Sequence, residues 1–298
     1  MSPEPPNRSH PWAVVVVLVA AVVGLAAVSP QVVQAGAGAQ AGAPPAATAG
    51  PPSGAVSVGA GGWVAITAPE GEGPHPVLVH VPGGGWASLD DEPFAAAFGH
   101  DDARAAGWAV ATVGYPVGPG VTAADQVAAV AAALEWLRTS ESVTGPGAPV
   151  VATAHSAGAH LLALATAEVA PVARPDRLVL VAGVYDLAED VRSSPLLGPG
   201  LDQALGCRVD ACAGGPELEP IRRVGPDLPP TVLVHGSADR VTPAAASARY
   251  ADALRAVGVP VGWHLVDGGF HRGEVTDAAV RSVVDDVLAQ VRTDRSSR

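Results

Sequence analysis

The sequence predicts an α/β protein in which a mostly parallel, twisted sheet is covered by helices on both faces. From residue 63 to residue 291, short apolar runs alternate with longer Ala-rich stretches, a pattern typical of strands joined by crossover helices. Some of these runs, such as VLV at 77–79 and LVLV at 178–181, are apolar at consecutive positions, which indicates strands buried on both faces. Hydrophobic residues make up 48% of the chain and charged residues 15%, as in a compact globular protein.

The hydrophobic periodicity assigns seven strands and five helices. The predicted strands span residues 63–67, 76–81, 108–113, 150–154, 178–182, 231–235 and 262–266. The predicted helices span residues 93–106, 122–139, 157–169, 243–257 and 274–291. In the second helix, Val127 and Leu134 share the apolar side and Asp125 marks the polar side, which is the pattern of a helix packed on a core.

The N-terminus predicts export. In residues 1–35, Arg8 precedes a long uncharged apolar run, and small residues end the segment at Ala35. This is the pattern of a cleaved secretory signal, although the run is also close to the length of an uncleaved N-terminal membrane anchor. Both interpretations place the rest of the chain outside the cytoplasm. Residues 36–54 are rich in Gly, Ala and Pro and predict a flexible linker, so the α/β domain is expected at residues 55–298.

Charge and cysteine content exclude two classes of partner. The net charge of −12 disfavours nucleic acid, because phosphate binding needs a basic surface. A small-molecule substrate is the expected partner, with membrane contact only through an uncleaved N-terminal segment. Cys207 and Cys212 are too few, without a nearby histidine, to complete a tetrahedral metal shell. In an exported protein they are expected to form a local disulfide, with two free thiols as the alternative.

An insertion at about residues 185–227 interrupts the alternation of strands and helices. It contains both cysteines and five prolines and has little regular periodicity. In this position it would lie over the carboxyl ends of the strands, where α/β proteins bind ligands. We therefore expect a lid or a cap that shapes the substrate site.

The pentapeptide AHSAG at 154–158 follows a predicted strand and precedes a predicted helix. A sharp turn of this kind exposes the serine hydroxyl above the sheet and needs small neighbours, because strand and helix pack closely there. The usual pattern is G-x-S-x-G, and Ala154 replaces the first glycine. Ser156 is therefore a candidate nucleophile, with an ordinary tight turn as the alternative.

A glycine-rich loop, PGGGW at 82–86, follows the strand 76–81. Acyl transfer needs amide N–H groups directed at the developing oxyanion, and glycines leave such groups accessible. The candidates are the N–H groups of Gly83, Gly84 and Ala157. A phosphate-binding P-loop is excluded because no Gly-Lys-Ser/Thr follows, and a plain flexible loop is the alternative.

Two further strand ends supply the partners of a serine nucleophile. Asp239 lies in HGSADRVTP at 235–243, after the strand 231–235, where a carboxylate that orients a histidine is expected. A turn residue before the next helix is the alternative, and Asp227 is less suitable because it precedes that strand. His271 lies in DGGFH at 267–271, after the last strand. The chain order is therefore Ser156, Asp239, His271.

From about residue 63 to residue 291, the chain resembles α/β-hydrolase esterases of the hormone-sensitive-lipase and feruloyl-esterase-like groups, the latter of the BD-FAE type. The resemblance rests on GGGW at 83–86, HSAGAHL at 155–161, GVYDL at 183–187 and HGSADRVTP. HSAGAH is also similar to the group that contains kynurenine formamidases. The chain departs from the pattern at two positions. Ala154 replaces the first glycine of the elbow, and Pro82 replaces a histidine that usually braces the oxyanion loop in these esterases.

The resemblance implies two-step acyl transfer without a metal or an organic cofactor. Ser156 would attack the ester carbonyl, His271 would take its proton, and Asp239 would hold the imidazole. The implied substrates are small or medium acyl esters, and Trp86, His155 and Tyr185 are candidate pocket residues. Two alternatives stay open. One is an amide hydrolase of the arylformamidase or peptidase kind, and the other is a non-catalytic binding module with the same fold.

Overall fold

The computed structural model describes residues 50–89, 96–141, 143–145, 147–209, 211 and 215–296. All of them belong to one compact unit within residues 43–298. The predicted signal or anchor segment, residues 1–35, and most of the predicted linker, 36–54, lie outside the described residues, and so does Cys212. Among the described residues, no helix combines the length and the apolar character needed to cross a membrane.

The described strands form one sheet in the order β1-β2-β4-β3-β5-β6-β7-β8. Their bounds are β1 (Val56–Ser57), β2 (Trp63–Thr67), β3 (Val77–Val81), β4 (Ala109–Gly114), β5 (Val150–His155), β6 (Arg177–Val181), β7 (Thr231–Gly236) and β8 (Val261–Val266). Strand β1 pairs antiparallel with β2, and β2 pairs antiparallel with β4. From β4 through β3 to β8, each strand pairs in parallel with the next one in the sheet. The seven predicted strands are confirmed to within one residue at each end. The short strand β1 was not predicted, because two residues carry no periodicity.

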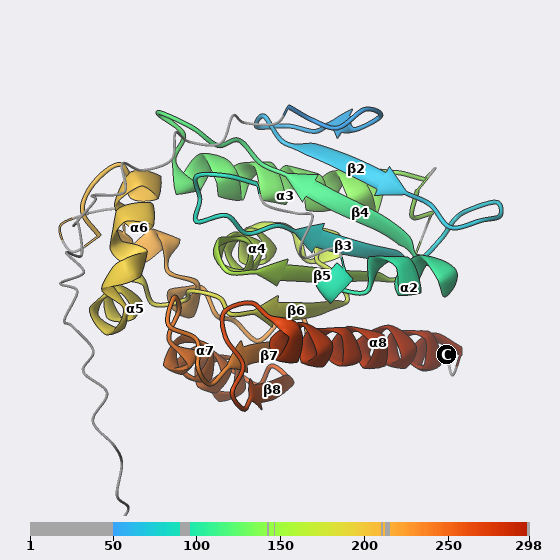
Figure 1. The fold of residues 1–298 in the computed structure, drawn as a ribbon. Coiled ribbons are helices and arrows are strands. Elements are labelled where there is room, and N and C mark those ends of the chain that lie inside the picture. The colour runs from blue at the N-terminus through green and yellow to red at the C-terminus, as the bar shows by residue number, and fades with distance from the viewer. Residues whose placement is uncertain are drawn as a thin grey trace, which may run out of the picture. The chain divides into compact units, whose positions relative to one another are not determined.

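Helices cover both faces of the sheet (Figure 1). Their bounds are α2 (His100–Ala105), α3 (Ala123–Thr139), α4 (Ala157–Glu168), α5 (Leu187–Ser193), α6 (Gly198–Leu205), α7 (Ala244–Ala256) and α8 (Glu274–Ser296). Short 3-10 turns are η1 (Pro171–Ala173), η2 (Pro195–Leu197), η3 (Gly215–Leu218) and η4 (Pro220–Arg222). Helix α3 begins with a capping box, in which Thr122 and Asp125 bind each other's backbone N–H groups.

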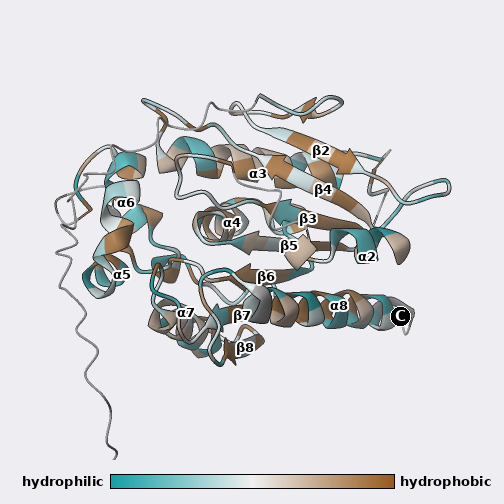
Figure 2. Ribbon diagram, viewed as in Figure 1, coloured by the Kyte–Doolittle hydropathy of each residue, from teal (hydrophilic) through white to brown (hydrophobic). Residues whose placement is uncertain are grey.

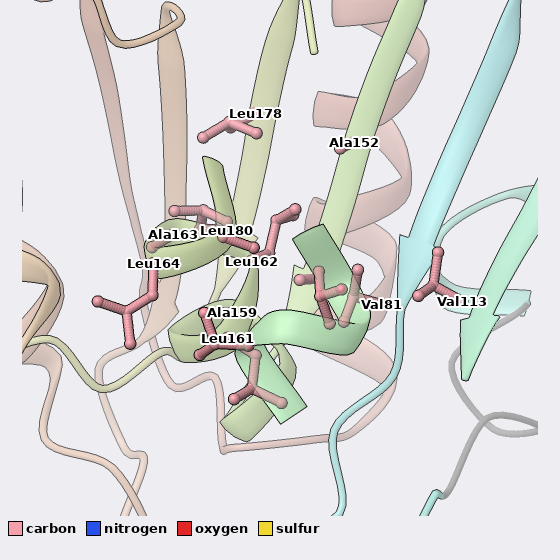
Figure 3. Close-up of a cluster of buried hydrophobic side chains, with 14 of the residues drawn as sticks. Val81, Val113, Ala152, Ala159, Leu161, Leu162, Ala163, Leu164, Leu178 and Leu180 are labelled. Carbon is pink, nitrogen blue, oxygen red and sulfur yellow. The ribbon is translucent and has the colours of Figure 1, made fainter. Parts of the chain in front are cut away.

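The apolar strands divide their side chains between two cores. Val77 and Val79 of β3 face the core that contains α3, α4 and α7, whereas Leu78 between them faces the core that contains α2 and α8. This alternation follows from the two-residue period of a strand. Figure 2 shows the central strands as largely hydrophobic and α8 as mixed. Figure 3 shows leucines of α4 together with Leu178 and Leu180 of β6, all of them members of the first core.

Two predicted segments differ from the structure. The helix expected at 93–106 is interrupted, because Gly99 has a left-handed φ of 65° at the N-cap of α2, and its first residues, up to residue 95, lie outside the described residues. The insertion at about 185–227 contains more regular structure than its sequence indicates, namely α5, α6 and the turns η2 to η4. Figure 1 shows α5 and α6 beyond the carboxyl ends of β5 and β6, the side of the sheet where a cap was predicted.

Candidate active site

Ser156 occupies the sharp turn between β5 and α4. Its φ of 54° and ψ of −124° lie outside the ordinary regions for a side-chain-bearing residue, a strain that costs about 1–3 kcal/mol and needs firm support. Support comes from the Ser156 N–H, which donates to the carbonyl of Val181 at 2.9 Å. A Cβ added at Gly158 would lie 2.4 Å from the carbonyl oxygens of Val81 and Pro82, so this elbow position requires glycine.

The structure brings together the three residues that were predicted from separate strand ends. His271 Nε2 lies 3.1 Å from the Ser156 hydroxyl, and His271 Nδ1 lies 2.7 Å from Asp239 Oδ2. Parallel strands explain the meeting, because the carboxyl ends of β5, β7 and β8 lie at one edge of the sheet. The order nucleophile, base, carboxylate is the one that proton transfer from serine needs.

The Asp239 carboxylate is held as an anion. Its side chain is fully buried, and burial alone would raise its pKa. Hydrogen bonds from His235 and His271, together with the backbone N–H of Val241, outweigh burial and hold the pKa of Asp239 well below its usual range. The carboxylate is therefore ionised at neutral pH and can support a positive charge on His271.

Thr242 and His235 complete the surroundings of Asp239. The Thr242 hydroxyl lies 2.8 Å from Asp239 Oδ2 and 3.1 Å from His271 Nδ1, and the Thr242 N–H donates to Asp239 Oδ1 at 3.0 Å. His235 is buried, with Nε2 at 3.2 Å from Asp239 Oδ2 and Nδ1 at 2.8 Å from the Ser247 hydroxyl. Both carboxylate oxygens are thus occupied, which fixes the orientation of the carboxylate toward His271.

The three predicted oxyanion donors lie around Ser156. A Cβ added at Gly83 would lie 3.3 Å from Ser156 Cβ, so the glycine loop packs directly against the elbow. Gly84 lines the same cavity as the serine. Ala157 is the first residue of α4, where helix N–H groups have no partner within the helix.

A cavity of about 250 Å³ opens at Ser156, and we refer to it as the Ser156 cavity. The loop after β3 contributes three of its residues, the cap three, and the elbow and the loops after β7 and β8 the remainder. They are Gly84, Gly85, Trp86, His155, Ser156, Leu196, Leu197, Gly200, Val241, His271 and Arg272. Trp86 and His155 therefore lie where a pocket was predicted.

Tyr185 does not line this cavity, contrary to the prediction. It is fully buried and stacks on Tyr250, with ring centroids 4.3 Å apart and an interplanar angle of 4°. The backbone N–H groups of Tyr185 and Asp186 also bind the buried carboxylate of Asp190. This turn leads the side chain into the core at the start of the cap.

Two buried histidines connect the elbow to its neighbours. His155 Nε2 donates to the carbonyl of His271 at 3.0 Å, which ties the elbow to the histidine loop. His160 Nδ1 accepts from the Trp86 indole at 3.2 Å, and its Nε2 donates to the carbonyl of Leu218 in the cap at 2.8 Å. Burial lowers the pKa of His155 well below its usual value and that of His160 to about 4, so both rings are neutral near pH 7.

A larger cavity, of about 480 Å³, lies at the opposite ends of the strands. It is lined by Thr231 and Val261, the first residues of β7 and β8, and by residues of α8 such as Asp286. Ligands of open α/β sheets bind at the carboxyl ends of the strands. The Ser156 cavity, although smaller, is therefore the candidate active site.

Several contributors were not found from the sequence. Leu196, Leu197 and Gly200 belong to the cap, whose sequence has no clear periodicity. Thr242 stands in the HGSADRVTP motif, but its contact with His271 depends on how two loops meet. Tyr115, whose hydroxyl lies 2.8 Å from the Pro82 carbonyl oxygen, was also missed. Its sequence signal was its place directly after β4, the strand beside β3, just as the glycine loop follows β3.

Comparison with known proteins agrees with this geometry. The BD-FAE family model matches residues 65–172, a segment that includes the glycine loop and the elbow. Esterase LipQ of Mycobacterium tuberculosis is 31% identical over 166 residues, which are 51% of this chain and 39% of that protein. The match therefore spans well under half the length of this curated relative.

Solved structures share the fold at lower identity. The propionate-bound esterase Est2 of Thermogutta terrifontis, a Planctomycetes species, has a TM-score of 0.62 at 24% identity, covering 78% of this chain and 90% of its own. A truncated carbohydrate esterase from gut microbiota has a TM-score of 0.64 at 19% identity, covering 79% and 92%. The chain therefore has the α/β-hydrolase fold, and its residues 65–172 match the BD-FAE family, as its motifs indicated.

Proposed function

We propose that the protein is a serine carboxylesterase that acts on small or medium acyl esters. The observation that carries the proposal is the continuous hydrogen-bonded series from Ser156 through His271 to Asp239, which ends in the Ser156 cavity. The similarity to esterases favours ester substrates, because the LipQ relative and the structural neighbours carry that name.

The proposed reaction has two steps. The Ser156 oxygen attacks the ester carbonyl while His271 Nε2 takes the hydroxyl proton, and the tetrahedral intermediate then expels the alcohol, which receives that proton from His271. Water attacks the acyl-enzyme in the second step, with His271 again as the base, and the acid leaves. Asp239 keeps the proton of the neutral imidazole on Nδ1 and stabilises the imidazolium that forms in each step.

The amides of Gly83, Gly84 and Ala157 are proposed to bind the oxyanion. Removal of one such donor typically lowers kcat ~100–1000-fold. The N-terminus of α4 adds a favourable positive potential at the same point, since helix dipoles attract negative charge there.

The walls of the Ser156 cavity favour a substrate whose acyl group is small. The Trp86 indole N–H donates to His160 Nδ1, which restrains the Trp86 ring. Gly200 of the cap lies close to the glycine loop, since a Cβ added at Gly200 would lie 3.2 Å from the Gly85 carbonyl oxygen. Leu196 and Leu197 add an apolar wall. These contacts leave little room for a long chain without movement of the cap.

We also propose that the domain acts outside the cytoplasm, on the grounds of the apolar run in residues 1–35 and the Gly/Ala/Pro-rich segment 36–54. Expression of the full chain in an exporting host, followed by mass spectrometry of the medium and the membrane fraction, tests this. A protein in the medium that begins near residue 36 indicates a cleaved signal. Full-length chain in the membrane indicates an anchor, and full-length chain confined to the cytoplasm contradicts the proposal.

The activity is tested with the domain from residue 36 and its Ser156→Ala variant on p-nitrophenyl esters of increasing chain length. We expect turnover that falls with long chains and is lost in the variant. Anilides of the same acids serve as the amide comparison. Preferred cleavage of the anilides would favour the amide-hydrolase alternative. A folded wild type that cleaves neither, and that a fluorophosphonate does not label at Ser156, would favour a binding module.

A further inference from the structure

The glycine loop has a backbone that needs external support. Gly84, Gly85 and Trp86 have successive φ angles of 124°, 60° and 62°, all in the left-handed region that non-glycine residues rarely adopt. Pro82, at the start of the loop, has no histidine side chain to brace it, unlike the resembling esterases. The Gly84 carbonyl accepts from the nearby N–H groups of Ala87 and Ser88, whereas the Pro82 and Gly83 carbonyls are held from outside the loop.

Tyr115 supplies such bonds at the first two carbonyls of the loop. Its hydroxyl lies 2.8 Å from the carbonyl oxygen of Pro82 and 3.2 Å from that of Gly83. The side chain is 2% exposed, and burial raises the pKa of its phenol far above the usual value, so the hydroxyl keeps its proton. A phenol at this position can only donate, since carbonyl oxygens do not donate, and its single proton is shared between the Pro82 and Gly83 carbonyls.

The geometry of the peptide bond gives these two contacts a consequence for catalysis. In a planar trans peptide, the C=O and the N–H of one unit point in opposite directions. The Pro82 carbonyl shares its peptide plane with the Gly83 N–H, and the Gly83 carbonyl shares its plane with the Gly84 N–H. A group that fixes both carbonyls therefore fixes the direction of both amides.

We propose that Tyr115 is a positioning residue for the oxyanion hole, which acts by holding the Pro82 and Gly83 carbonyls so that the Gly83 and Gly84 amides face the substrate oxyanion. The inference rests on the proposed esterase function. It gives the loop a brace from the residue directly after β4, the strand beside β3, in a chain that has Pro82 in place of the usual histidine.

A second side chain, Gln126, also holds the loop, but it cannot orient an oxyanion donor. Gln126 donates to the Trp86 carbonyl at 2.7 Å, and the N–H of the same peptide unit, which belongs to Ala87, is already bound to the Gly84 carbonyl.

The test is Tyr115→Phe, which removes only the hydroxyl. We expect kcat to fall roughly 10–100-fold with little change in KM, since misdirected donors weaken stabilisation of the transition state and not ground-state binding. The Ki of a trifluoromethyl ketone, whose serine adduct carries an oxyanion, should rise by about the same factor as kcat/KM falls. Titration with a fluorophosphonate gives the fraction of competent enzyme. Tyr250→Phe is the matched control, because Tyr250 is equally buried and stacks on Tyr185 away from the loop.

Each result supports or overturns the inference. Wild-type kcat and Ki in Tyr115→Phe overturn it. The inference is also overturned if kcat falls only in proportion to the fraction of enzyme that the fluorophosphonate labels, while the Ki of the trifluoromethyl ketone is unchanged. That result would mean that Tyr115 has a structural role alone. Activity that depends on Ser156 but not on Tyr115 leaves the proposed esterase function intact. A wild type with neither turnover nor fluorophosphonate labelling removes both proposals together.

Discussion

At the scale of single residues, the site depends on which atom of each side chain carries a proton. His271 must offer Nε2 as an acceptor to Ser156, so its Nδ1 must carry the proton that Asp239 Oδ2 accepts at 2.7 Å. Asp239 can only accept, because its carboxylate is ionised and the N–H groups of Val241 and Thr242 occupy its other oxygen. The tautomer of His271 is therefore set by the charge of Asp239.

Asp239→Asn reverses this arrangement. The Asn oxygen would keep the two backbone N–H groups, so its NH₂ would face His271 Nδ1 and move the ring proton to Nε2, where it blocks the base. We expect kcat to fall about 1000–10,000-fold. The melting temperature should fall as well, because the depressed pKa of Asp239 means that its charge stabilises the folded protein, so kcat is compared at a temperature where both variants are folded. Asp227→Asn is the control, because that exposed carboxyl group lies before β7. Equal loss in both variants, or none in Asp239→Asn, would contradict the assignment.

At the scale of elements, the elbow and the glycine loop form one tightly packed unit. The helix α4 starts so close to the end of β3 that Gly158 lies against the carbonyls of Val81 and Pro82. Any movement of α4 is therefore transmitted to the first carbonyl that Tyr115 binds. We therefore expect close packing here to matter for the proposed oxyanion donors as well as for stability.

Gly158→Ala tests this coupling. Its added methyl group would lie 2.4 Å from two carbonyl oxygens, and such overpacking costs about 1–3 kcal/mol of unfolding free energy. We expect lower stability in urea unfolding together with a loss of kcat beyond that explained by unfolded enzyme. Gly225→Ala, where a Cβ meets nothing within 4 Å, should keep both. Wild-type turnover in Gly158→Ala would refute the coupling.

The cap contributes a wall of the Ser156 cavity, and we expect this wall to limit acyl length. Leu196 of η2 lines the Ser156 cavity although its side chain is 70% exposed, so Leu196→Ala should change unfolding free energy by less than about 0.5 kcal/mol. We expect kcat/KM for a C8 p-nitrophenyl ester to rise relative to the acetate ester. The exposed Val172 of η1, outside the cavity, provides Val172→Ala as the control. An unchanged chain-length profile in Leu196→Ala would exclude Leu196 as a limit.

At the scale of the whole molecule, buried histidines link stability to pH. Burial lowers the pKa of His80, His100, His155 and His160, and for His100 and His160 the value is about 4 against an ordinary 6.5. Between pH 6.5 and 4, the unfolded chain therefore binds protons that the folded protein cannot accept. Above pH 6.5 these histidines are neutral in both states and do not lower the unfolding free energy. As the pH falls from 6.5 to 4, protonation of the unfolded chain lowers the unfolding free energy.

We expect the unfolding free energy to decrease steadily from pH 7 to pH 4, with His160 alone accounting for roughly 3 kcal/mol. Urea titrations at pH 7, 6, 5 and 4 measure the slope. His160→Asn should reduce the slope, whatever it does to stability at pH 7. A slope that His160→Asn leaves unchanged would contradict this explanation.

The sequence by itself determined the α/β-hydrolase fold and the positions of the seven longer strands. The physical reason is that buried parallel strands need consecutive apolar residues and leave short, recognisable runs, as in VLVHV and LVLV. It also placed Ser156, Asp239 and His271 at strand ends, because each follows such a run within a few residues. The helix at 93–106 was predicted as continuous because its apolar pattern runs through Gly99, whose left-handed backbone, which interrupts the helix, only the structure reveals.

Only the tertiary structure decided the contacts between segments that are distant in the chain. The Tyr115 brace, the Trp86–His160–Leu218 connection and the cap wall at Leu196 depend on how neighbouring strand ends and loops meet, which local periodicity does not encode. Tyr185 was a candidate pocket residue in the sequence, but in the structure it is buried against Tyr250. Chemistry-bearing residues were visible in the sequence because their types and spacing are constrained. The residues that hold them in place, such as Tyr115, were not visible, because a hydrogen bond to a distant segment places no constraint on the local sequence around the donor.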